Sequence, residues 1–287
     1  MRILHEIIQG LNNERFAFLI GNGPNLRSNL MPSWKDLLSR IADPPISFDL
    51  EGLSNTEVYD LIELNSVNMA APEDIKQKVC ECLSLDDSSG LEIHSRLMSL
   101  AIDYDAPVLT TNFDSAFEDS IKAKIHHFDS KTFTRFYPWK SYYGLKPVES
   151  PTSSFGIWKI HGDVRYKDSI RLGLSDYMGS VERARKLIHN GENRLFRGKR
   201  GEHWQGDKTW LQIWFSMPLI IFGLGCNVDE IFIRWLLIER KRYFNIHNYP
   251  MKVYYVSKGR PAASICNLLK PLSVEIKIIE DYDDLYR

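Results

Sequence analysis

The chain has 287 residues, of which 44% are hydrophobic, and its 36 basic and 37 acidic residues give a formal net charge of −1. A chain of this length and apolar content can bury one good core and carry a smaller insertion, whereas two fully independent domains are less favoured. Without a basic surplus, nucleic acid and anionic membranes are poor candidates for the main ligand, so we expect a small molecule instead.

The cysteines and the N-terminal segment bear on the cellular compartment. Cys80, Cys82, Cys226 and Cys266 are too few and too scattered for a disulfide framework. Polar residues interrupt the apolar residues of the first twenty positions, which therefore lack signal-peptide order, and no apolar run is long enough to cross a bilayer. We expect a reduced, cytoplasmic protein.

Six short apolar runs along the chain are typical of buried strands in a parallel sheet. They cover residues 16–20, 107–111, 155–160, 219–222, 251–256 and 274–279. Segments with helical periodicity lie between several of them, which is the pattern of a doubly wound α/β fold. The sequence therefore predicts a Rossmann-like domain with a mostly parallel central sheet.

Two helix starts are well marked. Ser33 precedes an apolar periodic segment, and Asp36 stands at the third helical position, as a capping arrangement requires. Asn227 and Glu230 are expected to open a second helix over residues 228–244, whose apolar stripe predicts deep packing.

Two insertions are expected within a single domain that spans residues 1–287. Residues 34–104 contain helical stretches and no convincing strand, which predicts a helical insertion between the first two strands. Residues 164–208 are richer in charge and glycine, which predicts a loop-rich insertion. The basic run 194–200 could mark a nucleic-acid patch, but a solvated loop is favoured because the rest of the chain has no basic surplus.

A glycine turn follows the first predicted strand, in the segment GNGPN at residues 21–25. Gly21 and Gly23 can adopt positive φ and let a pyrophosphate approach exposed backbone N–H groups. The full dinucleotide fingerprint needs a third glycine where Leu26 stands, so an ordinary strand-ending turn is nearly as well supported by this segment alone.

Polar residues follow the second predicted strand, in the segment TTNFD at residues 110–114. Ligands of open α/β sheets bind outside the carboxyl ends of the strands, so Thr111, Asn112 and Asp114 are expected to face a cleft. The alternative is that Asn112 or Asp114 merely caps a helix that begins near Phe113, and for each residue taken singly this alternative is favoured.

The third and fourth segments also place functional residue types at strand ends. His161 follows the third strand in WKIHGD, where it can transfer protons near neutral pH or can simply satisfy backbone groups at a turn. Gly223 and Gly225 form a second glycine turn before Asp229, which can bind a ribose hydroxyl or complement a helix dipole.

The four segments together resemble the SIR2-like family, the sirtuin relatives found in bacterial anti-phage defence. The resemblance covers roughly residues 16–256, and its most specific parts are TTNFD and WKIHG, with the two glycine turns as support. It implies NAD as the bound substrate.

The family resemblance also implies a role for each matching residue. Asn112 would bind the nicotinamide ribose and the hydrolytic water, Asp114 would orient the nicotinamide carboxamide, and His161 would accept a proton from water or a ribose hydroxyl. The glycine turns would hold the pyrophosphate and the adenosine side. The implied cofactor-binding residues are Gly21, Asn22, Gly23, Asn25, Thr111, Gly223, Gly225 and Asp229.

Three positions depart from the family pattern. The first turn of the family usually has alanine at Asn22 and serine at Asn25, and the second usually has serine at Gly225. These departures affect the expected phosphate and ribose contacts more than Asn112 and His161.

The resemblance implies an NAD hydrolase that releases nicotinamide and ADP-ribose. Protein-deacylating or ADP-ribosylating sirtuins are the nearest alternative, but their zinc module uses two Cys-x-x-Cys pairs, whereas this chain has a single Cys-x-Cys at residues 80–82. We therefore expect no bound metal and favour water as the acceptor. A non-enzymatic NAD or ADP-ribose sensor is a second alternative, although binding alone needs no base at the ribose.

An unregulated NAD hydrolase would harm its own cell, so control is expected. By resemblance, that control would come from homo-oligomerisation or from a partner protein, such as an ATPase or a nucleotide-processing sensor. No direct partner among nucleic acids or membranes is expected.

Overall fold

The computed structural model describes residues 1–43, 45–47, 49–67, 75–85, 89–128, 138–197 and 203–287. At its centre is an eight-stranded sheet with the order β3-β4-β5-β2-β1-β6-β7-β8. The strands are β1 Ala17–Ile20, β2 Val108–Thr110, β3 Lys124–His127, β4 Ser141–Gly144, β5 Ile157–Lys159, β6 Leu219–Phe222, β7 Val253–Lys258 and β8 Glu275–Ile279.

Every one of the six predicted strands is present, and neighbours among them pair in parallel. The two strands that sequence reasoning missed, β3 and β4, form an antiparallel extension at one edge. The α/β, mostly parallel fold predicted from the sequence is confirmed. Because β1 lies between β2 and β6, the strand order reverses on either side of it, and a crevice is expected outside its carboxyl end.

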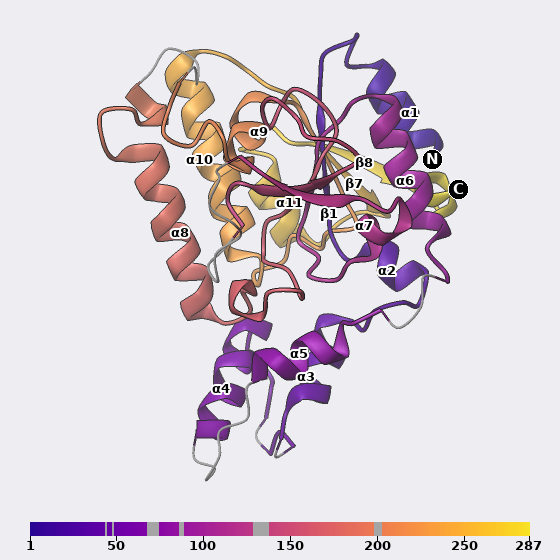
Figure 1. Cartoon of the computed structure of the whole chain (residues 1–287), viewed down its shortest axis with the longest axis vertical. Coiled ribbons are helices and arrows are strands. Elements are labelled where there is room, and N and C mark those ends of the chain that lie inside the picture. The colour runs from indigo at the N-terminus through magenta and orange to yellow at the C-terminus, as the bar shows by residue number, and fades with distance from the viewer. Residues whose placement is uncertain (44, 48, 68–74, 86–88, 129–137, 198–202) are drawn as a thin grey trace.

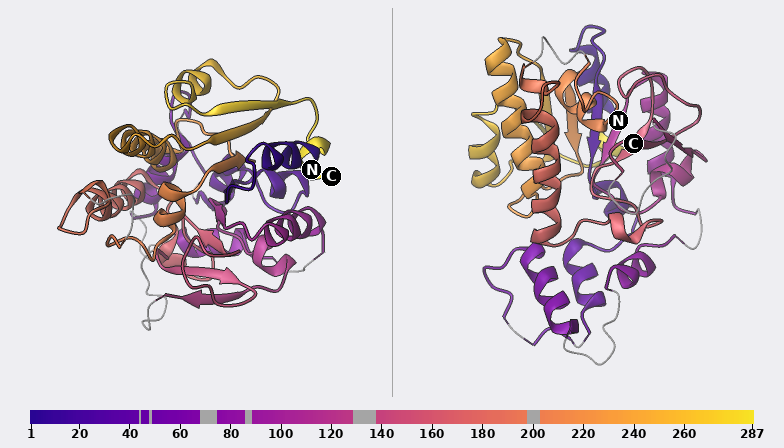
Figure 2. Two further views of the ribbon diagram at one scale, coloured as in Figure 1. Left: turned by 90° about the horizontal axis from the view of Figure 1, so that it is seen from above. Right: turned by 60° about the vertical axis from the view of Figure 1, so that its left-hand side comes forward.

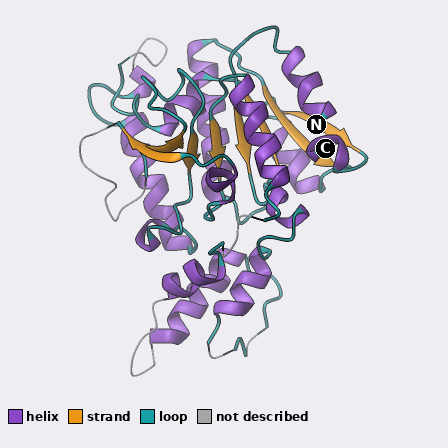
Figure 3. Ribbon diagram, turned by 45° about the vertical axis from the view of Figure 1, so that its right-hand side comes forward, coloured by secondary structure: helices purple, strands orange, loops and turns teal. Residues whose placement is uncertain are grey.

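Helices cover both faces of the sheet, and alternate strand residues enter two separate cores. Phe18 and Ile20 pack with one group of helices, while Ala17 and Leu19 pack with the other. The first group is α1 Arg2–Gln9, α6 Glu92–Asp103, α7 Ala116–Ser120 and α12 Asp283–Tyr286; the second is α8 Leu174–His189, α9 Trp210–Ser216, α10 Ile231–His247 and α11 Ala263–Leu269. Figure 3 shows these layers on either side of the strands, and Figure 2 gives two further views.

The described residues between β1 and β2 form helices and no strand. After the short α2 Gly23–Arg27 come α3 Trp34–Ile41, α4 Asn55–Val67 and α5 Ile75–Cys82. These last three helices form the lower part of Figure 1, beyond the sheet. They share a third core, in which Leu37, Val58 and Val79 pack with Ile170 and Leu172 from the segment after β5.

Of the two predicted helix starts, the first is confirmed and the second was three residues too early. Ser33 is the N-cap of α3, and its hydroxyl accepts the Asp36 backbone N–H at 3.2 Å. Helix α10 begins at Ile231 with Glu230 as N-cap, because the Glu230 N–H donates to the Asn227 carbonyl and closes a turn before the helix.

The segment predicted to be rich in loops contains a sixteen-residue helix, α8, besides the short 3-10 helices Lys167–Ser169 and Leu195–Arg197. Its charged residues made it look like a loop. However, Tyr177, Ala184 and Ile188 recur on one buried side, where they join the core that contains α10. Residues 198–202, which hold part of the basic run, lie outside the described residues.

None of the helices in the described ranges combines the length and the hydropathy that a membrane crossing needs.

Candidate functional site

A cleft with a volume of about 290 Å³ opens at the carboxyl ends of β1, β2, β5 and β6. This is the position at which open α/β sheets bind their ligands, and the volume is close to the lower end of the range for small-molecule sites. Helix α3 of the insertion contributes Trp34 and Leu37 to the opposite wall. The cleft therefore lies between the sheet and the helical insertion.

Most of the predicted site residues line this cleft. Those that do are Asn22, Thr111, Asn112, Asp114, His161, Gly223, Gly225 and Asp229. They come from four segments that are far apart in the sequence, and the sheet brings their strand ends together. Gly21, Gly23 and Asn25 do not line it.

His161 is 3% exposed, and both of its ring nitrogens have a polar neighbour. Nδ1 lies 3.1 Å from the Ile160 carbonyl, which can only accept, so this nitrogen carries a proton. Nε2 lies 3.3 Å from Oε2 of Glu230. Nε2 is thus the nitrogen available for exchange with a ligand.

Glu230 is a cleft residue that sequence reasoning missed as a site residue. It was read only as part of a helix start, yet it immediately follows Asp229 in the second glycine turn. That adjacency is the signal that could have identified it.

Rings enclose the histidine. Tyr177 meets His161 edge-on with ring centroids 5.2 Å apart, and Phe113 lies at 6.5 Å. Trp34 extends this wall, with its ring 6.4 Å from that of Phe113. The resulting apolar surroundings limit the access of bulk water to the imidazole.

Asn112 is 4% exposed and stands at the cleft with an unused hydrogen-bond donor. Its backbone N–H donates to Thr110 Oγ1 at 3.1 Å, but its side-chain Nδ2 has no partner among the described residues. Buried polar groups in native proteins are nearly always paired, so an unpaired donor beside a cleft indicates a group that a ligand or water satisfies.

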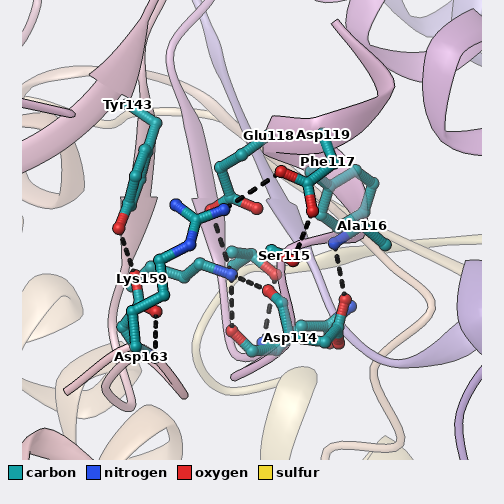
Figure 4. A network of polar contacts seen from close by, with 12 residues as sticks. Asp114, Ser115, Ala116, Phe117, Glu118, Asp119, Tyr143, Lys159 and Asp163 are labelled. Carbon is teal, nitrogen blue, oxygen red and sulfur yellow. Dashed lines mark hydrogen bonds and ion pairs between the residues drawn. The ribbon is translucent and has the colours of Figure 1, made fainter. Parts of the chain in front are cut away.

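A buried lysine fixes the loop that carries Asn112 and Asp114. Lys159, on β5, donates from Nζ to the carbonyls of both residues and forms an ion pair with Glu118 at 3.0 Å. Figure 4 shows the Lys159 side chain reaching towards Asp114 and Glu118. The predicted site loop is therefore tied to the neighbouring strand by its backbone carbonyls.

The charge balance around Lys159 follows from burial. Burial raises the pKa of the Glu118 carboxyl to about 7, against the opposing effect of the Lys159 ammonium. Burial alone would lower the pKa of Lys159, but the carboxylates of Glu118, Asp163 and Asp114 outweigh that effect and raise it. Lys159 therefore stays charged, and Glu118 is the partner that can take up a proton.

Asp163, the last residue of WKIHGD, supports the loop structure and does not line the cleft. Its Oδ2 accepts the Tyr143 hydroxyl at 2.6 Å, and its Oδ1 accepts the Arg165 backbone N–H at 2.9 Å. The Arg165 guanidinium lies 4.7 Å from the centre of the Tyr143 ring and pairs with Asp119 at 3.1 Å.

Asp114 lines the cleft and also shapes the following turn. Its Oδ1 accepts the N–H of Ala116, the first residue of α7, at 3.0 Å. Its Oδ2 accepts from Asn25 Nδ2 at 2.7 Å. The carboxylate therefore lies at the cleft and holds the turn before α7, but the N-cap of α7 is Ser115, so neither Asn112 nor Asp114 is the capping residue.

The expected pyrophosphate cradle at Gly21 and Gly23 is not what these residues form. Neither has a positive φ, and their N–H groups donate to the carbonyls of Phe222 and Gly223 at 3.1 and 2.9 Å. A Cβ at Gly21 or Gly23 would lie 2.5 Å from backbone atoms of Gly223. These glycines therefore serve the close approach of the two turns, and the positive φ of +65° belongs to Gly223.

Asn25 is also not placed for direct ligand contact, because it is fully buried behind Asn22 and Asp114. Asp229 does line the cleft, and its carboxylate accepts the backbone N–H of Asn55, the first residue of α4, at 2.8 Å. It therefore joins the second glycine turn to the helical insertion instead of acting on α10.

Within the described part of the chain, no group of three or more His, Cys, Asp or Glu side chains is arranged to hold a metal ion. Cys80 and Cys82 lie on α5, and all four cysteines are free thiols.

Residues 107–203, about a third of the chain, match the model of the SIR2-like domain family. The matched range contains Asn112, Asp114 and His161, and the mostly parallel sheet is consistent with a Rossmann-type domain of this kind. The match implies an activity that concerns NAD. Among curated proteins, none matches this chain.

Proposed function

We propose that this chain is an NAD hydrolase that cleaves the bond between nicotinamide and ribose. The single observation that carries the proposal is the buried, unpaired Nδ2 of Asn112, a residue that lines the same cleft as His161. A donor for a ribose hydroxyl and a base for water are the two groups that this hydrolysis requires.

In the proposed reaction, the bond between the ribose C1′ and the ring nitrogen of nicotinamide breaks, and its electron pair stays on the nitrogen. The pyridinium thereby becomes neutral nicotinamide, so no acid has to protonate the leaving group. The sugar passes through an oxocarbenium-like state, as in other glycoside cleavage. A water oxygen bonds to C1′ and gives ADP-ribose.

The residues of the cleft would divide the work. Asn112 would orient the ribose and the water, Asp114 would orient the carboxamide, and Nε2 of His161 would accept the proton that water loses. Asn22, Thr111, Gly223, Gly225 and Asp229 would contact the rest of the dinucleotide. Glu230 occupies Nε2 in this structure, so an incoming water or hydroxyl has to take its place.

The rigid loop supports this assignment, because Lys159 holds the carbonyls of Asn112 and Asp114 in place before a ligand binds. The surrounding aromatic rings also favour hydrolysis by a positioned water over reaction with bulk solvent.

The test is release of nicotinamide from NAD by the purified chain, alone and with an acylated peptide. We expect release from NAD alone, with equal amounts of ADP-ribose. Release that depends on the peptide would replace the proposal with a deacylase, and NAD binding without release from an activated preparation would replace it with a sensor.

For the biological role, we propose NAD depletion in bacterial anti-phage defence by a cytoplasmic protein held inactive until infection. Control would come from homo-oligomerisation or from a partner such as an ATPase or a nucleotide-processing sensor protein. Cellular NAD measured during phage infection should fall with the wild-type chain and stay constant with His161→Ala. A fall of equal size with both would contradict this role.

A further inference from the structure

A buried polar chain lies directly behind the cleft and consists of His94, Asn25 and Asp114. His94 is on α6 and is fully buried, and Asn25 is on α2 and is equally buried. Neither lines the cleft, whereas Asp114 does. We propose that His94 and Asn25 are positioning residues that fix the orientation of the Asp114 carboxylate and, resting on the proposed function, its selection of the nicotinamide carboxamide.

The donor and acceptor atoms of His94, Asn25 and Asp114 determine the direction of each hydrogen bond among them. The amide nitrogen of Asn25 donates to Asp114 Oδ2 at 2.7 Å and to Asn22 Oδ1 at 2.8 Å, which uses both of its protons. The amide oxygen of Asn25 lies 2.7 Å from Nε2 of His94. An amide oxygen can only accept, so His94 carries its proton on Nε2.

The second ring nitrogen of His94, Nδ1, indicates that the ring is neutral. Nδ1 is buried and has no partner among the described residues, so a proton there would be an unsatisfied buried donor. Burial accordingly lowers the pKa of His94 to about 4, although the carboxylates of Asp114 and Glu92 act in the opposite direction. The ring of Phe117 lies against that of His94, with centroids 5.0 Å apart.

This arrangement sets which face of Asp114 remains for a ligand. Each carboxylate oxygen can accept about two hydrogen bonds, and one position on each is used, by Ala116 N–H and by Asn25 Nδ2. The remaining positions accept only. They suit the N–H₂ group of a carboxamide and offer nothing to a carbonyl-only substituent.

The experiment compares NAD with its 3-acetylpyridine analogue, in which a methyl group replaces the carboxamide NH₂. His94→Phe keeps a ring against Phe117 but removes the donor to Asn25, whereas His94→Gln keeps an N–H donor. Met98→Leu, also fully buried on α6, is the matched control for packing. The readout is the ratio of kcat/KM for NAD to that for the analogue, because general loss of stability lowers both values together.

We expect His94→Phe to reduce that ratio roughly tenfold, the size of a hydrogen-bond difference of about 1.4 kcal/mol. His94→Gln and Met98→Leu should stay near the wild-type ratio. If folded His94→Phe loses activity equally on both substrates, or keeps the wild-type ratio, the positioning role is wrong.

A second measurement is independent of catalysis and so separates this inference from the proposed function. In wild-type protein with ¹⁵N-labelled histidine, the shifts of His94 should show a protonated Nε2 and a bare Nδ1 throughout pH 5 to 8. This result stands even if the protein releases no nicotinamide. A doubly protonated ring at pH 7, or a neutral ring with its proton on Nδ1, would contradict the hydrogen bond from His94 to Asn25 and overturn the positioning role.

Discussion

At the residue scale, the proposed reactivity of the cleft depends on the contact between Nε2 of His161 and the Glu230 carboxylate. Nδ1 is committed to the Ile160 carbonyl, so any exchange with a ligand takes place at Nε2, the atom that Glu230 faces. In the proposed reaction, substrate binding must therefore displace the carboxylate and leave Nε2 as an acceptor. The Ile160 carbonyl thus holds Nδ1 of His161, and in the proposed reaction ligand binding frees Nε2 from Glu230.

Removing either central residue should abolish most of the reaction. We expect His161→Ala and Asn112→Ala each to lower nicotinamide release by roughly 10² to 10⁴ fold, or about 3 to 5 kcal/mol of barrier, through loss of the base and of ribose orientation. The double variant should fall well short of the product of the two losses, because both residues act on one transition state. Circular dichroism should show unchanged folding. An active preparation with wild-type release after either change would refute the site.

A second prediction at this scale concerns pH and His94. Burial lowers the pKa of His94 from the ordinary 6.5 to about 4. Between pH 6.5 and 4, the unfolded chain therefore binds a proton at this histidine that the folded chain does not bind. The contribution of the neutral His94 to the free energy of unfolding should therefore be complete above pH 6.5. It should decrease as the pH falls towards 4, by roughly 3 kcal/mol at most.

Urea unfolding of wild type and His94→Gln at several pH values from 7.5 to 4.5 provides the measurement. Other groups titrate in both proteins, so the informative quantity is the difference between the two curves. Wild type should lose more stability than the variant as the pH falls. Parallel curves would mean that His94 is not the group responsible.

At the scale of elements, β5 supports the loop after β2 through a single ammonium group. Lys159→Met should leave the Glu118 carboxyl buried without its cation and cost about 3 to 5 kcal/mol of folding stability. Adding Glu118→Leu should recover much of that loss, since a buried ion pair can be replaced by apolar groups. Nicotinamide release should remain low in the double variant, because the carbonyls of Asn112 and Asp114 no longer have their donor.

Chemical denaturation and the release assay, run on both variants, separate the two effects. Recovery of wild-type release together with stability would show that Lys159 serves folding alone.

The sequence predicted the parallel strands, including the edge strand β8, but missed the antiparallel extension at the other edge. Strands such as β6, Leu219–Phe222, are buried on both faces and read as continuous apolar runs. Strand β3, Lys124–His127, is half exposed and polar, and β4, Ser141–Gly144, pairs with it antiparallel. Neither strand has the continuous apolar run by which the other strands were predicted.

The candidate site was also predicted where the sequence pattern is local and missed where it is not. Asn112, Asp114 and His161 were predicted to face a cleft because each follows a strand, and each lines one. The functions of Gly21 and His94 depend on residues far away in the sequence, Gly223 and Asn25, which no local pattern relates to them. Contacts of this kind are determined by the tertiary fold.

At the scale of the whole molecule, the cleft is a junction between the sheet and the helical insertion, and polar links hold the two together. Asp176, near the start of α8, accepts from Lys76 on α5 at 3.0 Å and from Arg171 at 3.2 Å. The Asp60 carboxylate of α4 accepts the Leu174 N–H at 3.0 Å. The position of the wall that carries Trp34 therefore depends on contacts outside the cleft.

Breaking one of these links should affect binding more than chemistry. We expect Asp176→Ala to raise KM for NAD several-fold with a smaller change in kcat, because the insertion no longer docks in one position while His161 and Asn112 stay in place. Hydrogen exchange should become faster in α4 and α5 and stay unchanged in β1 and β6. A lower kcat with unchanged KM would contradict this account.

The position of β1 in the sheet has a consequence for how the chain reaches this structure. Phe18 pairs with Val108 and Ala17 pairs with Leu219, so the central strand has no neighbour from its own part of the chain. Closing such long loops costs entropy before the pairing returns any stability, which makes folding slow. During synthesis, the carboxyl end of β1 stays open on one side until the ribosome has released the segment with Gly223 and Glu230. A growing chain therefore completes its cleft only after the segment with Gly223 and Glu230 has been made.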